Sequence, residues 1–293
     1  MITYIKIHGF KSFHNFEMVF TPLTVVAGVN ASGKSNLFDA LQLLARLAEV
    51  DLKTAFSEQR GHPSELFTQY DEDDYASEME FTVEMLVNPK VKDNWGGEAE
   101  LKYTRLRYQL KIKRESNTSG FKDLHIVDER LENLKHYEDK WFKEFIPKTV
   151  LDYWRPKVRK GRRAIPYIFT ENRQDIVTII VPQDGQQGNK KTFPANNVSQ
   201  TILSSFNTID FKHILAAKQE MLSWKFMQLN PKDLREPTRQ DIGIRDTITA
   251  SGKNLAATLF RIKQDDEYTL TAISRDLNNL LPNLTEVNVY DDK

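Results

Sequence analysis

The stretch that decides the fold is AGVNASGKSNLFDAL, residues 27–41, which follows the apolar run LTVV, residues 23–26. Residues 23–27 form a short, continuously apolar segment, which is typical of a β-strand buried on both faces. Leu37, Leu41, Leu44 and Ala48 then recur at helical spacing. The sequence therefore predicts a strand, a glycine-containing turn and a helix in direct succession.

The turn fits the phosphate-loop pattern G-x-x-x-x-G-K-[ST] from Gly28 to Ser35 at every fixed position. Gly28 and Gly33 permit positive φ and a close approach of the backbone to phosphate oxygens, which successive N–H groups and the helix N-terminus attract. Lys34 is then expected to reach the β- and γ-phosphates, and Ser35 to coordinate Mg²⁺. The alternative is an ordinary glycine turn whose lysine and serine face water.

Several stretches resemble a known family. GFKSF, residues 9–13, together with LTVVAGVNASGKSNLFDAL, is similar to the N-terminal lobe of ABC-type ATPases of the SMC, RecF and OLD group. LNPKDLREPT (229–238) and ASGKNLAATLFRI (250–262) resemble segments of RecF-like predicted AAA-family ATPases. The resemblance spans both ends of the chain and covers the middle only in outline.

The resemblance implies that this lobe holds ATP and Mg²⁺, with a second copy of the domain or a second subunit closing over the nucleotide. Lys34 would neutralise developing charge on the γ-phosphate, and Ser35 would hold the metal. The other residues implied to bind the cofactor are Asn30, Ala31, Ser32, Gly33 and Asn36 in the loop, and Lys11 and Ser12 in the preceding hairpin turn. Ala31 replaces a glycine common in the family, and a positive φ there would cost about 1 kcal/mol.

The expected fold class is α/β, a P-loop NTPase of the ABC-type head lobe with an inserted antiparallel β-rich subdomain and a helical segment. We expect the lobe at residues 1–50, the β-rich subdomain at 51–205, and the helical segment with a return strand at 206–293. Alternating runs at 79–87, 100–114 and 122–131 predict an antiparallel sheet with one wet face. Further expected elements are a hairpin at the N-terminus, a helical part at 133–154, a strand at 175–181, helices at 208–229, 252–263 and 269–281, and a strand at 285–290.

A Walker B motif, four apolar residues followed by Asp-Glu, is not evident. LHIVDE (124–129) is interrupted by His125, VTIIVPQD (177–184) contains Pro182, and VNVYDD (287–292) alternates with polar residues. ASGKN (250–254) superficially resembles a signature motif, but Ser251 is better explained as a helix N-cap. The attacking water is therefore expected to be oriented by residues outside this chain.

Six of the nine residues from Arg155 to Arg163 are basic, and Tyr153, Trp154 and Tyr167 lie nearby. This composition suits contact with a DNA backbone, although a solvated basic loop explains it equally well. Arg60 lies where the family bends back towards the nucleotide. The acidic run DEDD, residues 71–74, is typical of a solvated loop and is a weaker candidate for binding a metal.

The 293 residues carry a formal net charge of +0 and no cysteine, which excludes disulfides and thiolate metal sites. The six histidines show no zinc-ligand spacing, and G-x-S-x-G does not occur. We expect a cytoplasmic protein with no membrane segment. The function expected is the ATP·Mg²⁺-binding lobe of an ATPase in DNA repair, DNA maintenance or phage defence; the alternative is a nucleotide-gated module that binds nucleic acid or protein without turnover.

Overall fold

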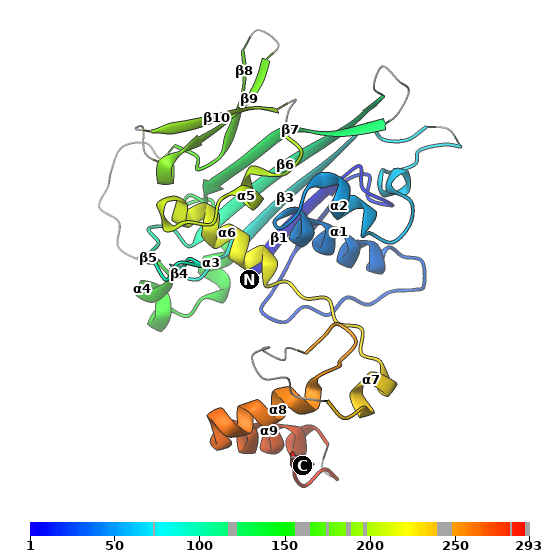
Figure 1. Ribbon diagram of the computed structural model, residues 1–293, viewed down its shortest axis with the longest axis vertical. Helices are drawn as coiled ribbons and strands as arrows, with labels where there is room; N and C mark the ends of the chain where they lie inside the picture. The colour runs from blue at the N-terminus through cyan, green and yellow to red at the C-terminus, as the bar shows by residue number, and fades with distance from the viewer. Residues whose placement is uncertain are drawn as a thin grey trace. The chain divides into compact units, whose positions relative to one another are not determined.

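A five-stranded antiparallel sheet forms the frame of the molecule in the computed structural model (Figure 1). The structure describes residues 1–72, 74–116, 122–155, 165–173, 176–185, 189–195, 198–238, 248–281 and 283–290. The chain divides into two compact units, Met1–Trp224 and Lys225–Lys293. The sequence-based division placed its boundaries at residues 50 and 205 instead.

The strand order of the main sheet is β2-β1-β3-β6-β7, so the N-terminal hairpin and the three long middle strands belong to one sheet. Its strands are β1 (Ile2–His8), β2 (Phe16–Val19), β3 (Glu78–Leu86), β6 (Arg105–Ser116) and β7 (Lys122–Asn133). The predicted N-terminal hairpin is confirmed by the antiparallel register Tyr4↔Val19 to Ile7↔Phe16. The predicted antiparallel middle strands are confirmed as well.

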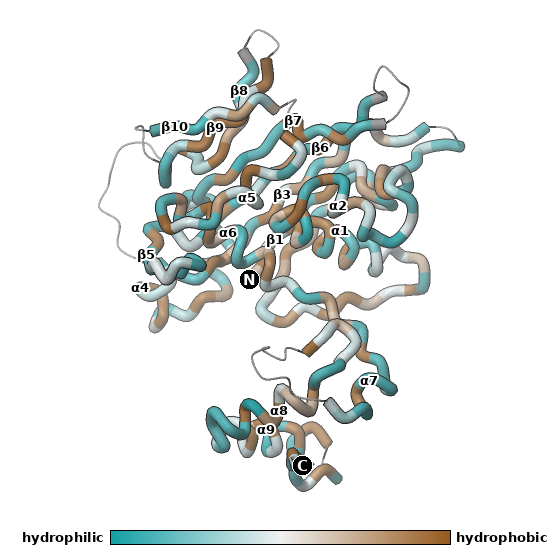
Figure 2. Tube along the Cα trace, in the orientation of Figure 1, coloured by the Kyte–Doolittle hydropathy of each residue, from teal (hydrophilic) through white to brown (hydrophobic). Residues whose placement is uncertain are grey.

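One face of this sheet carries the core. Ile5, Ile7, Phe81, Val83 and Leu110 alternate with polar neighbours and are 1% exposed or less. The helices α1 (Lys34–Leu47), α2 (Leu52–Ser57), α5 (Ile202–Ser205) and α6 (Lys212–Leu222) cover the same face (Figure 1). Both hydrophobic and hydrophilic residues occur along these helices (Figure 2). Each large apolar side chain buried in this way stabilises the fold by about 1.5–3 kcal/mol.

The remaining elements of the first unit flank the main sheet. They are the two-stranded sheet β4 (Lys90–Lys92) and β5 (Glu98–Glu100), the helices α3 (Lys140–Phe145) and α4 (Leu151–Trp154), and the sheet β8 (Phe169–Arg173), β9 (Ile176–Pro182) and β10 (Lys190–Pro194). Short 3₁₀ turns lie at Pro63–Leu66, Lys148–Val150, Gln183–Gly185 and Ile209–Phe211. The strand predicted at 175–181 corresponds to β9.

The second unit contains α7 (Pro231–Arg235), α8 (Leu255–Asp265) and α9 (Glu267–Leu280). The helices predicted at 252–263 and 269–281 are therefore confirmed with shifted ends. α8 and α9 pack against each other, with Ala257 and Leu270 buried. Within the described ranges, no helix has both the length and the apolar character needed to cross a lipid bilayer.

Three expected elements are wrong in the described parts of the chain. Residues 23–27 form no strand, and Leu23 and Val25 are each 83% exposed, because no described strand lies beside them to pair with. Residues 285–290 likewise form no strand. The helix predicted at 208–229 ends at Leu222, seven residues early.

Two helix boundaries also differ from their predictions. Asn230 and Pro231, which directly follow the helix predicted at 208–229, begin α7, because the Asn230 side chain accepts the Lys232 N–H and proline suits the first helical position. The residue that precedes α8 is Asn254, with φ 67°, and not Ser251. In both cases the capping residues alone are compatible with more than one helix boundary, and the tertiary structure determines which boundary forms.

Gly9 is required where the N-terminal hairpin passes close to β3. Its φ is +71°, and a Cβ at this position would lie 2.2 Å from the Glu78 carbonyl oxygen. The oxygen belongs to the backbone, and the backbone also fixes the position of a Cβ, so neither atom can rotate away. The turn that follows, Lys11 to Phe13, therefore depends on this glycine for its place.

We expect Gly9→Ala to lower the free energy of unfolding by about 2–4 kcal/mol, measured by urea denaturation. Gly96→Ala is the matched control, because Gly96 has φ +87° but a Cβ there would meet nothing within 4 Å. It should cost only about 1 kcal/mol. Equal losses in the two variants would show that the contact with Glu78 is unimportant.

Candidate functional site

The glycine loop before α1 has the left-handed backbone that an anion cradle requires. Gly33 precedes α1 with φ 87°, and Ala31 has φ 65°, so the strain predicted for alanine at this position is present. Gly28 is not among the residues with positive φ. A Cβ at Gly28 would lie 3.0 Å from Ser32 Oγ, so a larger residue would require the Ser32 hydroxyl to shift.

Lys34 lies over its own loop. Its Nζ donates to the carbonyl oxygens of Gly28 at 2.7 Å and Val29 at 2.6 Å. Ser35 is exposed in the first turn of α1, and Asn30, Ala31 and Ser32 are exposed in the loop. The loop thus presents a cation, a hydroxyl and the N-terminus of a fourteen-residue helix at one place.

The N-terminal hairpin turn lies against this loop, as the resemblance implied for Ser12. Asn36 Nδ2 donates to Ser12 Oγ at 2.8 Å. A Cβ on Gly33 would lie 3.2 Å from the same Ser12 oxygen. The structure therefore brings Ser12, Gly33 and Asn36 together, although they are separated by up to 24 residues.

Lys11 belongs to the same neighbourhood through a carboxylate that sequence reasoning missed. Lys11 Nζ and Arg60 Nη2 both donate to Asp39 Oδ2, at 2.6 and 2.8 Å. Asp39 follows Ser35 by four residues on α1, and this i,i+4 spacing is the signal that could have identified it. Asp39 thus joins the hairpin turn, α1 and the turn at Arg60.

A hollow of about 420 Å³ opens beside these groups. Its lining residues are Lys11, Ser12, Arg60, Glu65, Phe67, Gln69 and Tyr75. Aromatic rings, an amide and cations line it together, which suits the ribose and base of a nucleotide better than a purely apolar ligand. The donor set fits ATP with Mg²⁺: N–H groups and Lys34 for phosphate, and the Ser35 hydroxyl for the metal. Among the residues that could be searched, no group of three or more His, Asp or Glu side chains could itself hold a metal.

The Walker B candidate at 124–129 has a different role. Glu129 on β7 is 0% exposed, and its carboxylate accepts from Tyr108 Oη at 3.0 Å and from the N–H groups of Ile202 at 2.7 Å and Leu203 at 2.9 Å. Burial raises the pKa of Glu129 to about 7, against the opposing effect of these hydrogen bonds. With its oxygens fully engaged far inside the core, Glu129 is a structural carboxylate that fastens α5 to the sheet. Asp184 of the second candidate pairs with His213, and Asp291 and Asp292 of the third lie outside the described residues.

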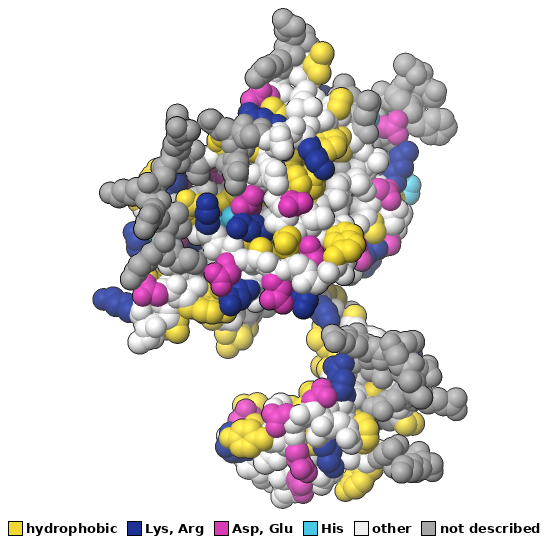
Figure 3. All heavy atoms as spheres, turned by 60° about the vertical axis from the view of Figure 1, so that its left-hand side comes forward, with side chains coloured by type: hydrophobic (Ala, Val, Ile, Leu, Met, Phe, Trp, Pro, Cys, Tyr) yellow, Lys and Arg dark blue, Asp and Glu magenta, His cyan; other side chains and the backbone are white. Residues whose placement is uncertain are grey.

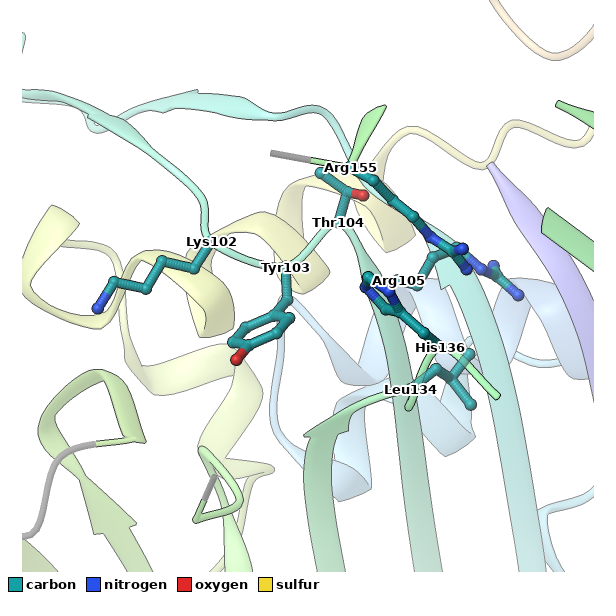
Figure 4. A pocket seen from close by; sticks show the side chains of 7 residues that line it. All are labelled: Lys102, Tyr103, Thr104, Arg105, Leu134, His136 and Arg155. Atoms are coloured by element: carbon teal, nitrogen blue, oxygen red, sulfur yellow. The ribbon is translucent and has the colours of Figure 1, made fainter. Parts of the chain in front are cut away.

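The predicted DNA-contacting segment begins at a structural arginine. Arg155 and Arg105 share Asp139, at 2.5 and 3.1 Å, beside a small pocket of about 10 Å³ (Figure 4). The Arg155 guanidinium also lies 3.8 Å from the Phe142 ring centre. Burial alone would raise the pKa of Asp139, but the hydrogen bonds and charges of the arginines lower it. Figure 4 shows Lys102 pointing away from the two arginines.

Residues 156–163, the rest of this predicted segment, lie outside the described residues. On the face shown in Figure 3, basic and acidic side chains are interspersed over the coloured part of the surface. That part of the surface therefore adds no broad basic area to the predicted DNA contact.

We expect Glu129→Ala to destabilise the protein by about 3–5 kcal/mol at low pH, because three buried donors lose their acceptor. The raised pKa means that folded Glu129 keeps its proton more tightly than the unfolded chain does. Its stabilising contribution is therefore full below about pH 4.5 and is lost as the pH rises through about 7. The difference between wild type and variant should shrink by roughly 3 kcal/mol across this window.

Chemical denaturation at several pH values measures this difference. Glu132→Ala is the control on the same strand, because Glu132 forms a partly exposed pair with Arg130. It should have a small and nearly constant effect. A Glu129→Ala penalty independent of pH would contradict the assigned protonation.

Comparison with known proteins identifies the family. Residues 1–281 match the model of the AAA ATPase domain. A solved structure described for ATP-driven dimerization and DNA-stimulated activation of SMC ATPases is similar at 18% identity, covering 43% of this chain and 68% of that one, with a TM-score of 0.29. The search of curated proteins gave no significant match. Because the family model covers residues 1–281 and the phosphate loop of the chain is formed, the chain belongs to the AAA ATPase domain family, in agreement with the P-loop ATPase resemblance of its sequence.

Proposed function

We propose that this chain binds ATP with Mg²⁺ at the loop from Gly28 to Ser35 and acts as the nucleotide-holding lobe of an ATPase. The observation that carries the proposal is the position of Lys34, whose ammonium lies on two loop carbonyls at the N-terminus of α1. A cation on a flexible side chain can turn from these neutral acceptors to a phosphate, which forms stronger, charge-assisted hydrogen bonds. The family assignment supports the same ligand class.

The roles of the site residues follow from their places. Ser35 would hold Mg²⁺, while the backbone from Asn30 to Gly33 would donate N–H groups to the phosphates. Asn36, bonded to Ser12, would fix the hairpin turn beside the α-phosphate and ribose. The metal held by Ser35 would supply charge that neutralises the phosphates.

Hydrolysis would need further residues to orient the attacking water. Glu129 is fully engaged in the core, and no other carboxylate of the Walker B candidates stands in the described part of the site. We therefore place the catalytic carboxylates outside this chain's described residues, in a second copy or a second subunit. Residues 23–27 form no strand, and Leu23 and Val25 are exposed, so this segment is where such a partner would add strands. DNA repair, DNA maintenance and phage defence remain the proposed settings, with DNA contact through the part of the predicted segment 155–163 that follows Arg155.

The engagement of Glu129 in the core also favours a second function. A lobe that binds nucleotide but holds no catalytic carboxylate would be a nucleotide-gated module, which changes its contacts with nucleic acid or protein without turnover of its own. Phosphate release by the isolated chain would favour the ATPase, because the module predicts no release. Measurable release by wild type, lost in Lys34→Ala, would rule out the module.

We expect calorimetric titration to show Mg·ATP binding that Lys34→Ala weakens by about tenfold to a hundredfold, since the variant loses a charge-assisted contact worth about 1.5–3 kcal/mol. Lys53→Ala is the control, because Lys53 lies on α2 with an 84% exposed side chain. It should leave the affinity unchanged. Equal affinities of wild type and Lys34→Ala would overturn the proposed site.

A further inference from the structure

We infer that a small monovalent anion of the halide class, such as chloride, binds beside Arg155 in the small pocket where β6 begins. The pocket has a volume of about 10 Å³, about the space that one water molecule needs. Lys102, Arg105, His136 and Arg155 are among its lining residues, and no acidic residue is among the described residues that line it. The phosphate loop contributes nothing to this pocket, so the inference is independent of the proposed nucleotide site.

The cluster around the pocket has more arginines than carboxylates. Arg105 binds both oxygens of Asp139, with Nε and Nη2 each at 3.1 Å, and Arg155 Nη2 donates to the same carboxylate at 2.5 Å. Glu84 lies 3.7 Å from Arg105 but is paired with Arg107 at 2.7 Å. Within the described part of this cluster, three guanidinium groups therefore face two carboxylates, which leaves one positive charge in excess.

This excess charge lies where water screens it poorly. The side chains of Arg105, Arg155 and Asp139 are 4%, 12% and 1% exposed. An uncompensated charge removed from water costs free energy, and an anion of opposite sign recovers part of it. Asp139 itself cannot compensate both of its partners, because its single negative charge is shared between two cations.

Arg155 retains donors for such an anion. A guanidinium has five N–H groups, and in the described structure the Arg155 side chain makes one hydrogen bond, to Asp139. One face of the group lies on Phe142, 3.8 Å from the ring centre. The carboxylate and the ring therefore hold the guanidinium in place without using its remaining N–H groups.

His136 lies in the positive field of this cluster. Burial lowers the pKa of His136, the charges of Arg155 and Lys143 lower it further, and Asp139 opposes them. The imidazole is therefore neutral at neutral pH and can donate one N–H without adding to the excess charge. Figure 4 shows His136 close to Arg155, whereas Lys102 points away. An anion in the pocket would raise the pKa of His136.

Size and charge together select the ligand. A pocket of about 10 Å³ excludes sulfate, phosphate and organic anions such as gluconate. A halide is monovalent, so it cancels the single excess charge and introduces none of its own. Chloride and gluconate therefore form a matched pair of probes, which differ in size at equal charge.

The first test is thermal unfolding of the whole chain in sodium chloride and in sodium gluconate, at equal ionic strength of about 0.2 M so that general screening is the same. Chloride should raise the Tm of wild type by about 2–4 °C, because it binds the folded state alone. In Arg155→Gln the two salts should give the same Tm. Asp139 keeps both bonds from Arg105 in this variant, so the carboxylate remains paired and the excess charge is gone.

Arg130→Gln is the matched control. Arg130 pairs with Glu132 on β7 at 2.8 Å, is 39% exposed and does not line the pocket. This variant loses the same charge elsewhere and should keep the full chloride shift. Equal Tm values of wild type in the two salts, or a full chloride shift in Arg155→Gln, would overturn the anion site.

A second measurement uses folded wild type alone, so it does not depend on the stability of any variant. The pKa of His136, followed by NMR, should rise when chloride replaces gluconate. The exposed His14 should titrate alike in both salts. A His136 pKa that does not change, or that changes only as much as the pKa of His14, would overturn the inference.

Discussion

The site depends on the attachment of one hairpin turn to the first two turns of one helix. Asn36 donates to Ser12, and Asp39 accepts from Lys11. These bonds fix α1, and with it the phosphate loop that precedes α1, beside the β1–β2 turn. The turn itself lies where it does because Gly9 passes close to the Glu78 carbonyl. The sheet, the hairpin turn and α1 are therefore held together, and the phosphate loop, residues 28–35, lies exposed at the N-terminus of α1. Without this attachment the loop would be a flexible connection, since the segment before it has no strand partner in the described structure.

Lys34 has only neutral partners within the cradle, since its Nζ donates to two loop carbonyls. Such partners hold the side chain near the proposed phosphate site, and a phosphate would form stronger hydrogen bonds with it. Glu129 illustrates the opposite arrangement, a carboxylate whose three donors are buried and cannot exchange. Perturbation of its pKa alone would have suggested catalysis, whereas its contacts assign it to the fold.

The sequence pattern predicted those elements that depend on interactions between residues close together in the chain. The phosphate loop, the helix after it and the alternating strands of the wet-faced sheet follow from residue type and spacing, and the structure confirms them. Residues 23–27 have the composition of a buried strand, but a strand needs neighbours, and none lies beside them among the described residues. Asn230 and Pro231 suit either end of a helix, so only the tertiary structure decides between them. Asp39 escaped sequence reasoning because its partners come from the hairpin turn and from the turn at Arg60, far apart along the chain.

The most direct test of the account is the structure of this chain crystallised with Mg²⁺ and a non-hydrolysable ATP analogue. The account predicts phosphates against residues 28–35, Mg²⁺ on the Ser35 hydroxyl, and Lys34 Nζ turned from the carbonyls of Gly28 and Val29 to the β- and γ-phosphates. Nucleotide bound elsewhere, or a Lys34 that keeps both carbonyl bonds beside a bound nucleotide, would contradict it.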